Sequence, residues 1–257
     1  MPRMLSLAAV AVLSLNTMQA AAQFRPEEVR AAQKDPRQFT IDEKTITFEN
    51  LGPTVSPSEI PPPQTDPGGD PFPVLDQIIN MGKKIWAIIE ANKPVVNINT
   101  TYATALPEGI KSWNQLSGWK PPKGTVYGFY AKNAYGATMI NVKYQVLRTY
   151  GGGYKGKGKY LTAVTIEPLL VEVGWGYKFD LTAQVPDTSV VNVGTSEDPV
   201  AAMMPTLKWR ISTAIKDASG QSIYYLQGDG LFQEMGGPFK KGLEDDVATA
   251  LQGTIPL

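Results

Sequence analysis

Strict alternation of apolar and polar residues is the feature that most limits how this chain can fold. Between Val171 and Val185 (VEVGWGYKFDLTAQV) every second residue is apolar, including Trp175. Successive side chains of a β-strand point to opposite faces, so this pattern predicts a strand with one buried face. A strand from Leu169 to Val185 would be about 56 Å long, whereas most strands span about 17–20 Å. We therefore expect Gly174 and Gly176 to mark a bend, a bulge or a passage between two sheets.

The same alternation recurs along the chain after Pro94. It predicts further strands at 95–103, 125–131, 138–150, 160–166, 189–193, 207–216 and 222–227. Glycine-containing turns are expected at 133–136, 151–153 and 217–220, because glycine readily adopts the positive φ that hairpins need. Short connections without helices indicate antiparallel neighbours. We predict a mainly β fold in which residues 94–235 form an antiparallel β-sandwich of Ig-like or jelly-roll type.

Helices are expected on both sides of this domain. Apolar residues between 70 and 93 follow a helical spacing, with Asp70 and Pro71 suited to the start and Pro94 to the end. This pattern predicts one long amphipathic helix packed on the sandwich. A shorter helix is expected at 239–252, within a C-terminal region that covers 236–257.

The segment before the predicted long helix is a polar arm, residues 23–69. Within it, residues 26–33 can form a short helix, and residues 39–48 alternate like a strand. Eight of the 22 residues from 52 to 73 are proline, which predicts an extended linker.

Residues 1–22 have the organisation of a secretory signal peptide. Arg3 supplies positive charge, residues 5–15 are an apolar run, and the three alanines at 20–22 fit cleavage before Gln23. An apolar run of this length is too short to span a bilayer as a helix. We expect an exported protein, periplasmic or secreted to the cell surface, with no transmembrane helix in the mature chain.

The chain has neither cysteine nor histidine. This composition excludes disulfides, catalytic sites of the Ser-His-Asp and Cys-His types, and the usual zinc sites. We therefore expect no cofactor and no metal site. Catalysis by two carboxylates remains open, as in glycoside hydrolysis, but nothing in the spacing selects a pair among the candidates Glu167, Glu172, Asp180, Asp229 and Glu234.

Charge is unevenly distributed although the net charge is zero. After residue 166 there are twelve acidic and six basic residues. Such a split predicts either a basic face for an anionic partner or basic strands that lie beside acidic ones. The stretch 109–166 contains no acidic residue and nine basic ones, namely Lys111, Lys120, Lys123, Lys132, Lys143, Arg148, Lys155, Lys157 and Lys159.

The candidate ligand-binding residues belong to this basic stretch. The hairpin sequence RTYGGGYKGKGKY, residues 148–160, and the segment GIKSWNQLSGW, residues 109–119, combine cations with aromatic rings. Lysines bind phosphate and carboxylate groups, and aromatic rings stack on sugars or lie at membrane interfaces. A solvated hairpin beside a packed crossover loop is the simpler alternative. The candidates are Arg148, Lys155, Lys157, Lys159, Tyr154, Trp113 and Trp119.

These observations predict an exported, non-catalytic binding or structural protein of a bacterial cell envelope. Expected partners are an anionic glycan, a lipid headgroup or a cell-wall polymer, and a protein partner in the envelope, whereas nucleic acid is not expected outside the cytoplasm. A glycan-active enzyme that uses two carboxylates is one alternative. A small outer-membrane β-barrel is another, although the proline-rich arm and the two expected helices fit it poorly.

Overall fold

The computed structural model describes residues 24–54, 73–95 and 102–236. Within these ranges the protein is mainly β, and α2 is the only α-helix. The predicted signal peptide and C-terminal helix lie outside the described residues. The elements are α2 (Pro26–Lys34), β1 (Ile41–Thr54), β2 (Val74–Asn80), β3 (Ile85–Glu90), β4 (Lys93–Pro94), β5 (Ala103–Glu108), η1 (Trp113–Gln115), β6 (Lys123–Asn133), β7 (Thr138–Tyr154), β8 (Lys157–Val173), β9 (Tyr177–Gln184), η2 (Asp187–Ser189), β10 (Val191–Asn192), β11 (Ala201–Met203), β12 (Thr206–Thr213), β13 (Asp217–Gln227) and β14 (Phe232–Gly236).

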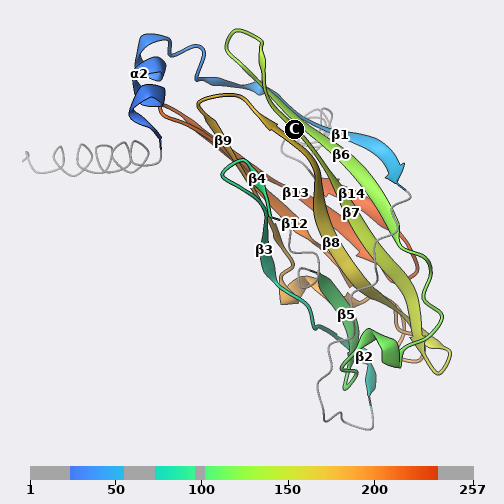
Figure 1. The fold of residues 1–257 in the computed structure, drawn as a ribbon. Helices are drawn as coiled ribbons and strands as arrows, with labels where there is room; N and C mark the ends of the chain where they lie inside the picture. Colours follow the sequence, from blue (N-terminus) through green and yellow to red (C-terminus); the bar gives the residue numbers. More distant parts are fainter. Residues whose placement is uncertain (1–23, 55–72, 96–101, 237–257) are drawn as a thin grey trace, which may run out of the picture.

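The strands form two sheets, and every pairing between these strands is antiparallel, as predicted. Sheet A has the order β1-β6-β7-β8-β5-β2. Sheet B has the order β10-β11-β13-β12-β9-β3-β4, with β14 beside β13. The described part of the molecule is elongated, and α2 lies at the opposite end from the turn between β7 and β8 (Figure 1).

Aromatic side chains from both sheets meet in one shared core. Phe129 of β6 lies 4.9 Å from the Phe179 ring of β9 and 5.2 Å from the Trp209 ring of β12, measured between ring centroids. The hydroxyls of Tyr144 in β7 and Tyr224 in β13 are 2.7 Å apart and form a buried hydrogen bond. These inward-facing rings come from alternate positions of their strands, as the period of two requires.

The bend expected at Gly174 and Gly176 carries the chain from one sheet to the other. β8 belongs to sheet A and β9 to sheet B, and the three residues between them form the turn. Gly176 has φ +78°, and a Cβ there would lie 2.3 Å from the Phe39 ring. The turn also interrupts the alternation, so Trp175 is 52% exposed rather than buried as the pattern predicted.

Strands of 17 residues nevertheless form in this protein, because β7 and β8 each have that length. Their pairing contains four register irregularities. Extra residues of this kind bend and twist a strand pair. One of them includes Ala163, which has φ +52°, a conformation that non-glycine residues rarely adopt. Bulges therefore let these strands run along the molecule without being straight.

The long helix expected at 70–93 is a wrong prediction, because the described part of this range forms β2 and β3. Met81 and Lys83 donate backbone hydrogen bonds to the carbonyls of Thr104 and Tyr102, at 3.0 and 2.9 Å. A Cβ on Gly82 would lie 2.1 Å from the Tyr102 carbonyl oxygen, so the contact requires glycine. Pairing of β2 with β5 and of β3 with β9 outweighs the helical spacing of the apolar residues.

Other local predictions have mixed outcomes. The short helix in the arm is α2, the following strand is β1, and the turn at 133–136 is present with φ +82° at Gly136. Two expected turns are wrong. Residues 151–153 continue β7, and 217–220 begin β13, while the turns fall at 155–156 and 214–215. β7 therefore ends later, and β13 begins earlier, than the glycine-containing turns predicted.

Candidate functional site

The hairpin turn between β7 and β8 carries most of the predicted site. The turn residues Lys155 and Gly156 have φ of +49° and +81°, and the strands on either side bring Tyr154, Lys157 and Lys159 to the same end of the molecule. All three lysines are exposed. The Lys155 ammonium lies 5.2 Å from the centroid of the Tyr154 ring. We call hairpin residues 154–159, together with the neighbouring residues 111–123, the tip.

The segment from Ser117 to Lys120 lies along β7 as an extension of β6. The backbones of Ser117 and Gly153 exchange two hydrogen bonds of 3.0 and 2.8 Å, and the Lys120 N–H donates to the Tyr150 carbonyl at 2.9 Å. Three backbone hydrogen bonds therefore fix this segment on the hairpin. The two regions that the sequence offered as separate candidates form one surface.

The glycine run of β7 provides the space for Trp119. A Cβ on Gly152 would lie 2.4 Å from the Trp119 ring, so a larger residue could not occupy this position without moving the indole. The Trp119 indole N–H donates to the Trp113 carbonyl at 3.1 Å. Both tryptophans are partly buried against the core. They hold the tip together and leave only part of each ring available to a partner.

Arg148 does not lie on the lysine surface. Its residue exposure is 6%, and its guanidinium lies 4.1 Å from the centroid of the Phe232 ring in β14. One of its nitrogens donates to the Thr125 hydroxyl at 3.4 Å. Burial lowers the pKa of Arg148 from its ordinary value, because desolvation disfavours the charged form. Its position in β7 points it between the sheets, so we omit it from the candidate surface.

An acidic loop borders the other side of the hairpin. The Gly158 N–H donates to the Asp198 carboxylate at 2.9 Å, and the Lys159 N–H donates to the Pro199 carbonyl at 2.9 Å. In the next residue of β8, the Tyr160 hydroxyl donates a hydrogen bond to the Leu75 carbonyl at 2.8 Å. Burial, followed by the nearby Asp198 and Asp76 carboxylates, raises the pKa of Tyr160. The tip is thus basic on the side of residues 111–123 and acidic on the side of Asp198.

The structure also tests whether neighbouring carboxylates neutralise the basic stretch. Among the described residues, none of its nine cations lies in an ion pair. The alternative of basic strands beside acidic ones stays open, because Lys132 of β6 lies directly opposite Asp42 of β1 in sheet A, although the two side chains form no ion pair. Three of the nine cations instead lie over aromatic rings, in the pairs Arg148–Phe232, Lys123–Tyr150 and Lys155–Tyr154.

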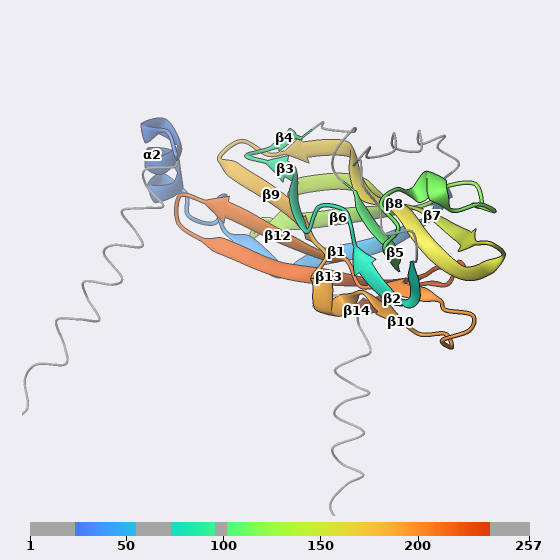
Figure 2. The ribbon, with the colours of Figure 1, turned by 90° about the horizontal axis from the view of Figure 1, so that it is seen from below.

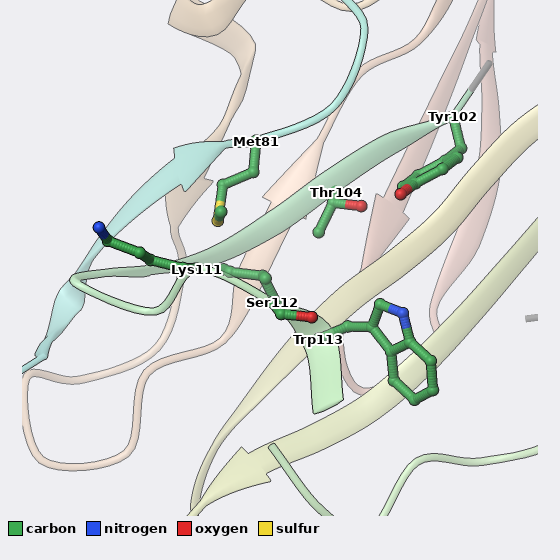
Figure 3. Close-up of a pocket in the computed structure, with 7 residues that line it drawn as sticks. Met81, Tyr102, Thr104, Lys111, Ser112 and Trp113 are labelled. Carbon is green, nitrogen blue, oxygen red and sulfur yellow. The ribbon is translucent and has the colours of Figure 1, made fainter. Parts of the chain in front are cut away.

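Figure 3 shows a shallow hollow beside η1, which sequence reasoning did not identify. Its volume is about 230 Å³, counted with the solvent that enters it. Its floor includes the start of β5, and Lys111 lies at one end (Figure 3). The Ser112 hydroxyl oxygen is buried there without a hydrogen-bond partner among the described residues. No motif marks this hollow, because its lining comes from three separate segments: Met81, Tyr102, Thr104, Leu106, Lys111, Ser112 and Trp113.

The five candidate catalytic carboxylates have separate surroundings. Glu167 and Glu172 each accept a hydrogen bond from a side-chain amide of β7, at 2.9 and 2.6 Å. Asp180 and Asp229 accept backbone N–H groups at 2.7 and 3.0 Å, while Glu234 lies in β14. Four of the five thus have a structural hydrogen bond, and no two of them share one.

Residues 24–54, 73–95 and 102–236 contain no group of three or more acidic side chains placed to hold a metal ion. No helix in the same ranges has the length and apolar character needed to cross a membrane. Comparisons of this chain with protein-family models, curated proteins and solved structures found no match.

Proposed function

We propose that this chain is an exported, non-catalytic binding or structural protein of a bacterial cell envelope, and that its tip contacts an anionic polymer. One observation carries the proposal. The lysines of the tip lie in no ion pair with a described carboxylate, although the hairpin that presents them is fixed by backbone hydrogen bonds and by Trp119.

Lysine is well suited to this role because its ammonium is a compact charge on a flexible stem. Lys155, Lys157 and Lys159 can therefore follow phosphate or carboxylate groups whose spacing is irregular. Tyr154 contributes an aromatic face beside Lys155, and Trp113 and Trp119 mainly position the hairpin. Clustered charges of one sign also accelerate encounters with a polyanion.

The apolar surface of the tip favours a polymer over insertion into a lipid bilayer. Among the described residues of 109–123 and 148–160, no large apolar side chain is exposed. Interfacial membrane anchors need exposed aromatic or aliphatic groups that enter the headgroup region. An anionic glycan or cell-wall polymer therefore fits best, and binding to lipid headgroups is an outcome that the experiment distinguishes.

We also propose that the two sheets form a β-sandwich of the Ig-like or jelly-roll type. Phe129 of sheet A contacts Phe179 and Trp209 of sheet B, and contacts of this kind between two sheets support the proposed class. Such folds host many unrelated functions, so the functional proposal rests on the tip alone.

Co-sedimentation tests the binding proposal directly. The protein is mixed with purified cell-wall sacculi, anionic liposomes and neutral liposomes, each at low and high salt. We expect pelleting with sacculi that weakens as salt rises, because ionic contacts are screened. The triple variant Lys155→Gln, Lys157→Gln, Lys159→Gln should lower the affinity at least tenfold and reduce the salt dependence.

The matched control removes three positive charges elsewhere, with Lys132→Gln, Lys143→Gln and Lys208→Gln. If both triple variants lose affinity equally, net charge rather than the tip governs binding. Pelleting with anionic liposomes alone would replace the polymer by a lipid surface. No pelleting under any condition would reject the proposal.

Export has its own test. Expression of the full chain and of a chain that lacks residues 2–22, followed by separation of periplasm, membrane and cytoplasm, should place only the full chain outside the cytoplasm. Equal distribution of the two chains would contradict export through this segment.

A further inference from the structure

The hollow beside η1 adjoins the tip and shares residues with it. Its floor includes part of β5, which lies between β8 and β2 in sheet A, and Figure 2 shows these strands at the same end of the molecule as the β7–β8 turn. Thr104 and Leu106 occupy alternate positions of β5 and both line the hollow. Lys111, Ser112 and Trp113 belong to the tip itself. A partner that lies on the tip can therefore also reach the hollow.

Hydrogen bonds hold the tip side of the hollow in place. The Gln115 side-chain carbonyl accepts the backbone N–H groups of Lys111 and Ser112, at 2.7 and 3.1 Å. The Trp113 carbonyl accepts the Trp119 indole N–H at 3.1 Å. The hollow therefore has its shape before a ligand arrives, which lowers the entropic cost of binding.

The lining combines one cation with a hydroxyl and apolar groups. The Lys111 ammonium lies in no ion pair with a described carboxylate, including Glu108, the acidic residue nearest to it in sequence. The buried Ser112 hydroxyl has no hydrogen-bond partner among the described residues, although buried polar groups usually have one. Met81 and Trp113 add apolar surface. The hollow thus offers a positive charge and a hydroxyl beside apolar side chains.

We infer that the hollow binds one acidic sugar unit of the polymer, with the sugar carboxylate at Lys111 and Ser112. The C–H face of the sugar ring then lies against Met81 and Trp113, since aromatic and apolar side chains bind such faces. This inference rests on the proposed function and narrows the anionic polymer to one whose charges are sugar carboxylates. A phosphate group can also pair with Lys111, but it has no apolar surface to bury beside the lysine.

Isothermal titration calorimetry of the intact protein, at one fixed ionic strength, tests this inference. The probes are an oligomer of galacturonic acid, a polyphosphate of the same charge, and a neutral oligosaccharide of the same length as the oligomer. We expect the galacturonate oligomer to bind about tenfold more tightly than the polyphosphate, because one of its rings buries apolar surface in the hollow. The neutral oligosaccharide should bind too weakly to measure, because it lacks the charge that pairs with lysine.

Three variants locate the binding. Lys111→Gln should lower the affinity for the galacturonate oligomer about fivefold more than Lys120→Gln does. Lys120 is the matched control, since it belongs to the same segment but does not line the hollow. Met81→Gln keeps the length of the side chain but makes it polar, so the affinities for the galacturonate oligomer and the polyphosphate should become more similar. Circular dichroism spectra of all variants should match the parent, which separates loss of binding from loss of folding.

Two results would overturn the inference and leave the proposed function standing. The parent protein could bind the polyphosphate as tightly as the galacturonate oligomer, or Lys111→Gln and Lys120→Gln could weaken binding of the oligomer equally. In both cases the tip would still bind a polyanion. Absence of binding to the oligomer would also overturn the inference, whereas co-sedimentation with sacculi decides the proposed function separately.

Discussion

The α2 end of the molecule and the tip differ in how their charges are satisfied. At the α2 end, Arg25 pairs with Glu28 at 3.1 Å and Lys216 pairs with Glu43 at 2.6 Å. At the tip, the lysines lie in no ion pair with a described carboxylate. Backbone hydrogen bonds and an indole seated on glycine hold the tip instead.

The two ends of the molecule are therefore stabilised by different kinds of contact. At the α2 end, Arg25 is paired with a residue close to it in sequence, whereas Lys216 is paired with Glu43 of the distant strand β1. Where a stretch contains only basic residues, the hairpin must be stabilised by contacts that do not involve charge. The lysine ammonium groups at the tip then remain accessible to a partner, which is the basis of the proposed function.

Alkaline pH should have the largest effect on the whole molecule. Burial raises the pKa of Tyr144 and Tyr224 far above the ordinary 10.0 and also raises those of Tyr127, Tyr160 and Tyr177. The stability from keeping these phenols neutral is complete below pH 10 and is lost as pH rises toward their folded-state pKa values. Each can lower the free energy of unfolding by up to about 1.4 kcal/mol per pH unit above 10.

Tyrosinate absorbance, followed together with circular dichroism, checks this expectation. Tyr160 lies near the tip and Tyr177 near α2, so one shared step would show that both ends unfold with the core. Separate steps would show that one end opens before the other.

Substitution of a glycine should affect the α2 end more than the tip. Gly176→Ala meets both a positive φ and the Phe39 ring, which lies 2.3 Å from the new Cβ. We expect a loss of about 2–4 kcal/mol in the free energy of unfolding. Gly156→Ala has a similar φ of +81° but no atom within 4 Å of the new Cβ, so about 1 kcal/mol is expected.

Urea denaturation of both variants measures the difference. Equal losses would mean that the Phe39 ring moves aside without cost and that backbone conformation alone matters at the two turns.

Substitution of a tryptophan, in contrast, should lower the free energy of unfolding more at the tip than at the α2 end. Trp119→Ala empties the space above Gly152 and removes the hydrogen bond to Trp113, with an expected cost of about 2–4 kcal/mol. Trp175→Ala removes one exposed ring that contacts Phe39, at a centroid distance of 5.7 Å, with an expected cost of about 0.5–1.5 kcal/mol.

Binding to sacculi, measured on the same two variants under conditions in which both are folded, adds a second readout. Trp119→Ala should weaken binding because the hairpin loses its support, whereas Trp175→Ala should leave binding unchanged. The opposite result would move the binding surface to the α2 end.

The smallest effects are expected for surface charges. Lys216→Gln removes a solvent-exposed ion pair with Glu43 and should change the free energy of unfolding by less than about 0.5 kcal/mol. The triple lysine variant of the tip should change it no more, because those side chains have no carboxylate to lose. A marked gain in stability for the triple variant in urea denaturation would show that the tip lysines repel one another in the folded state.

The strands were predictable where alternation and pairing agree. Residues 207–213 alternate strictly and form β12, and the glycines at 174 and 176 mark the transfer from sheet A to sheet B. The range 74–90 was misassigned because adjacent apolar pairs, such as Ile78 and Ile79, fit a helix face and an edge strand equally well. Its Gly82 was the available warning, since glycine is unfavourable within a helix.

The site was predictable in composition but not in geometry. The sequence identifies the lysines and tryptophans of the tip, because both types are concentrated in 109–160. It does not show that Trp119 rests on Gly152, since that contact depends on the register between distant segments. The inward direction of Arg148 likewise depends on its register in β7, opposite Lys123.

The strand order has a consequence for synthesis of the chain. β1 pairs with β6, β2 with β5, and β3 with both β4 and β9, so most partners of the first strands are made much later. Contacts between distant segments form slowly because long loops must close first. By contrast, β6, β7 and β8 follow one another and can pair as they emerge. Neither sheet can be completed early, and the N-terminal third of the chain leaves the ribosome before its partners exist.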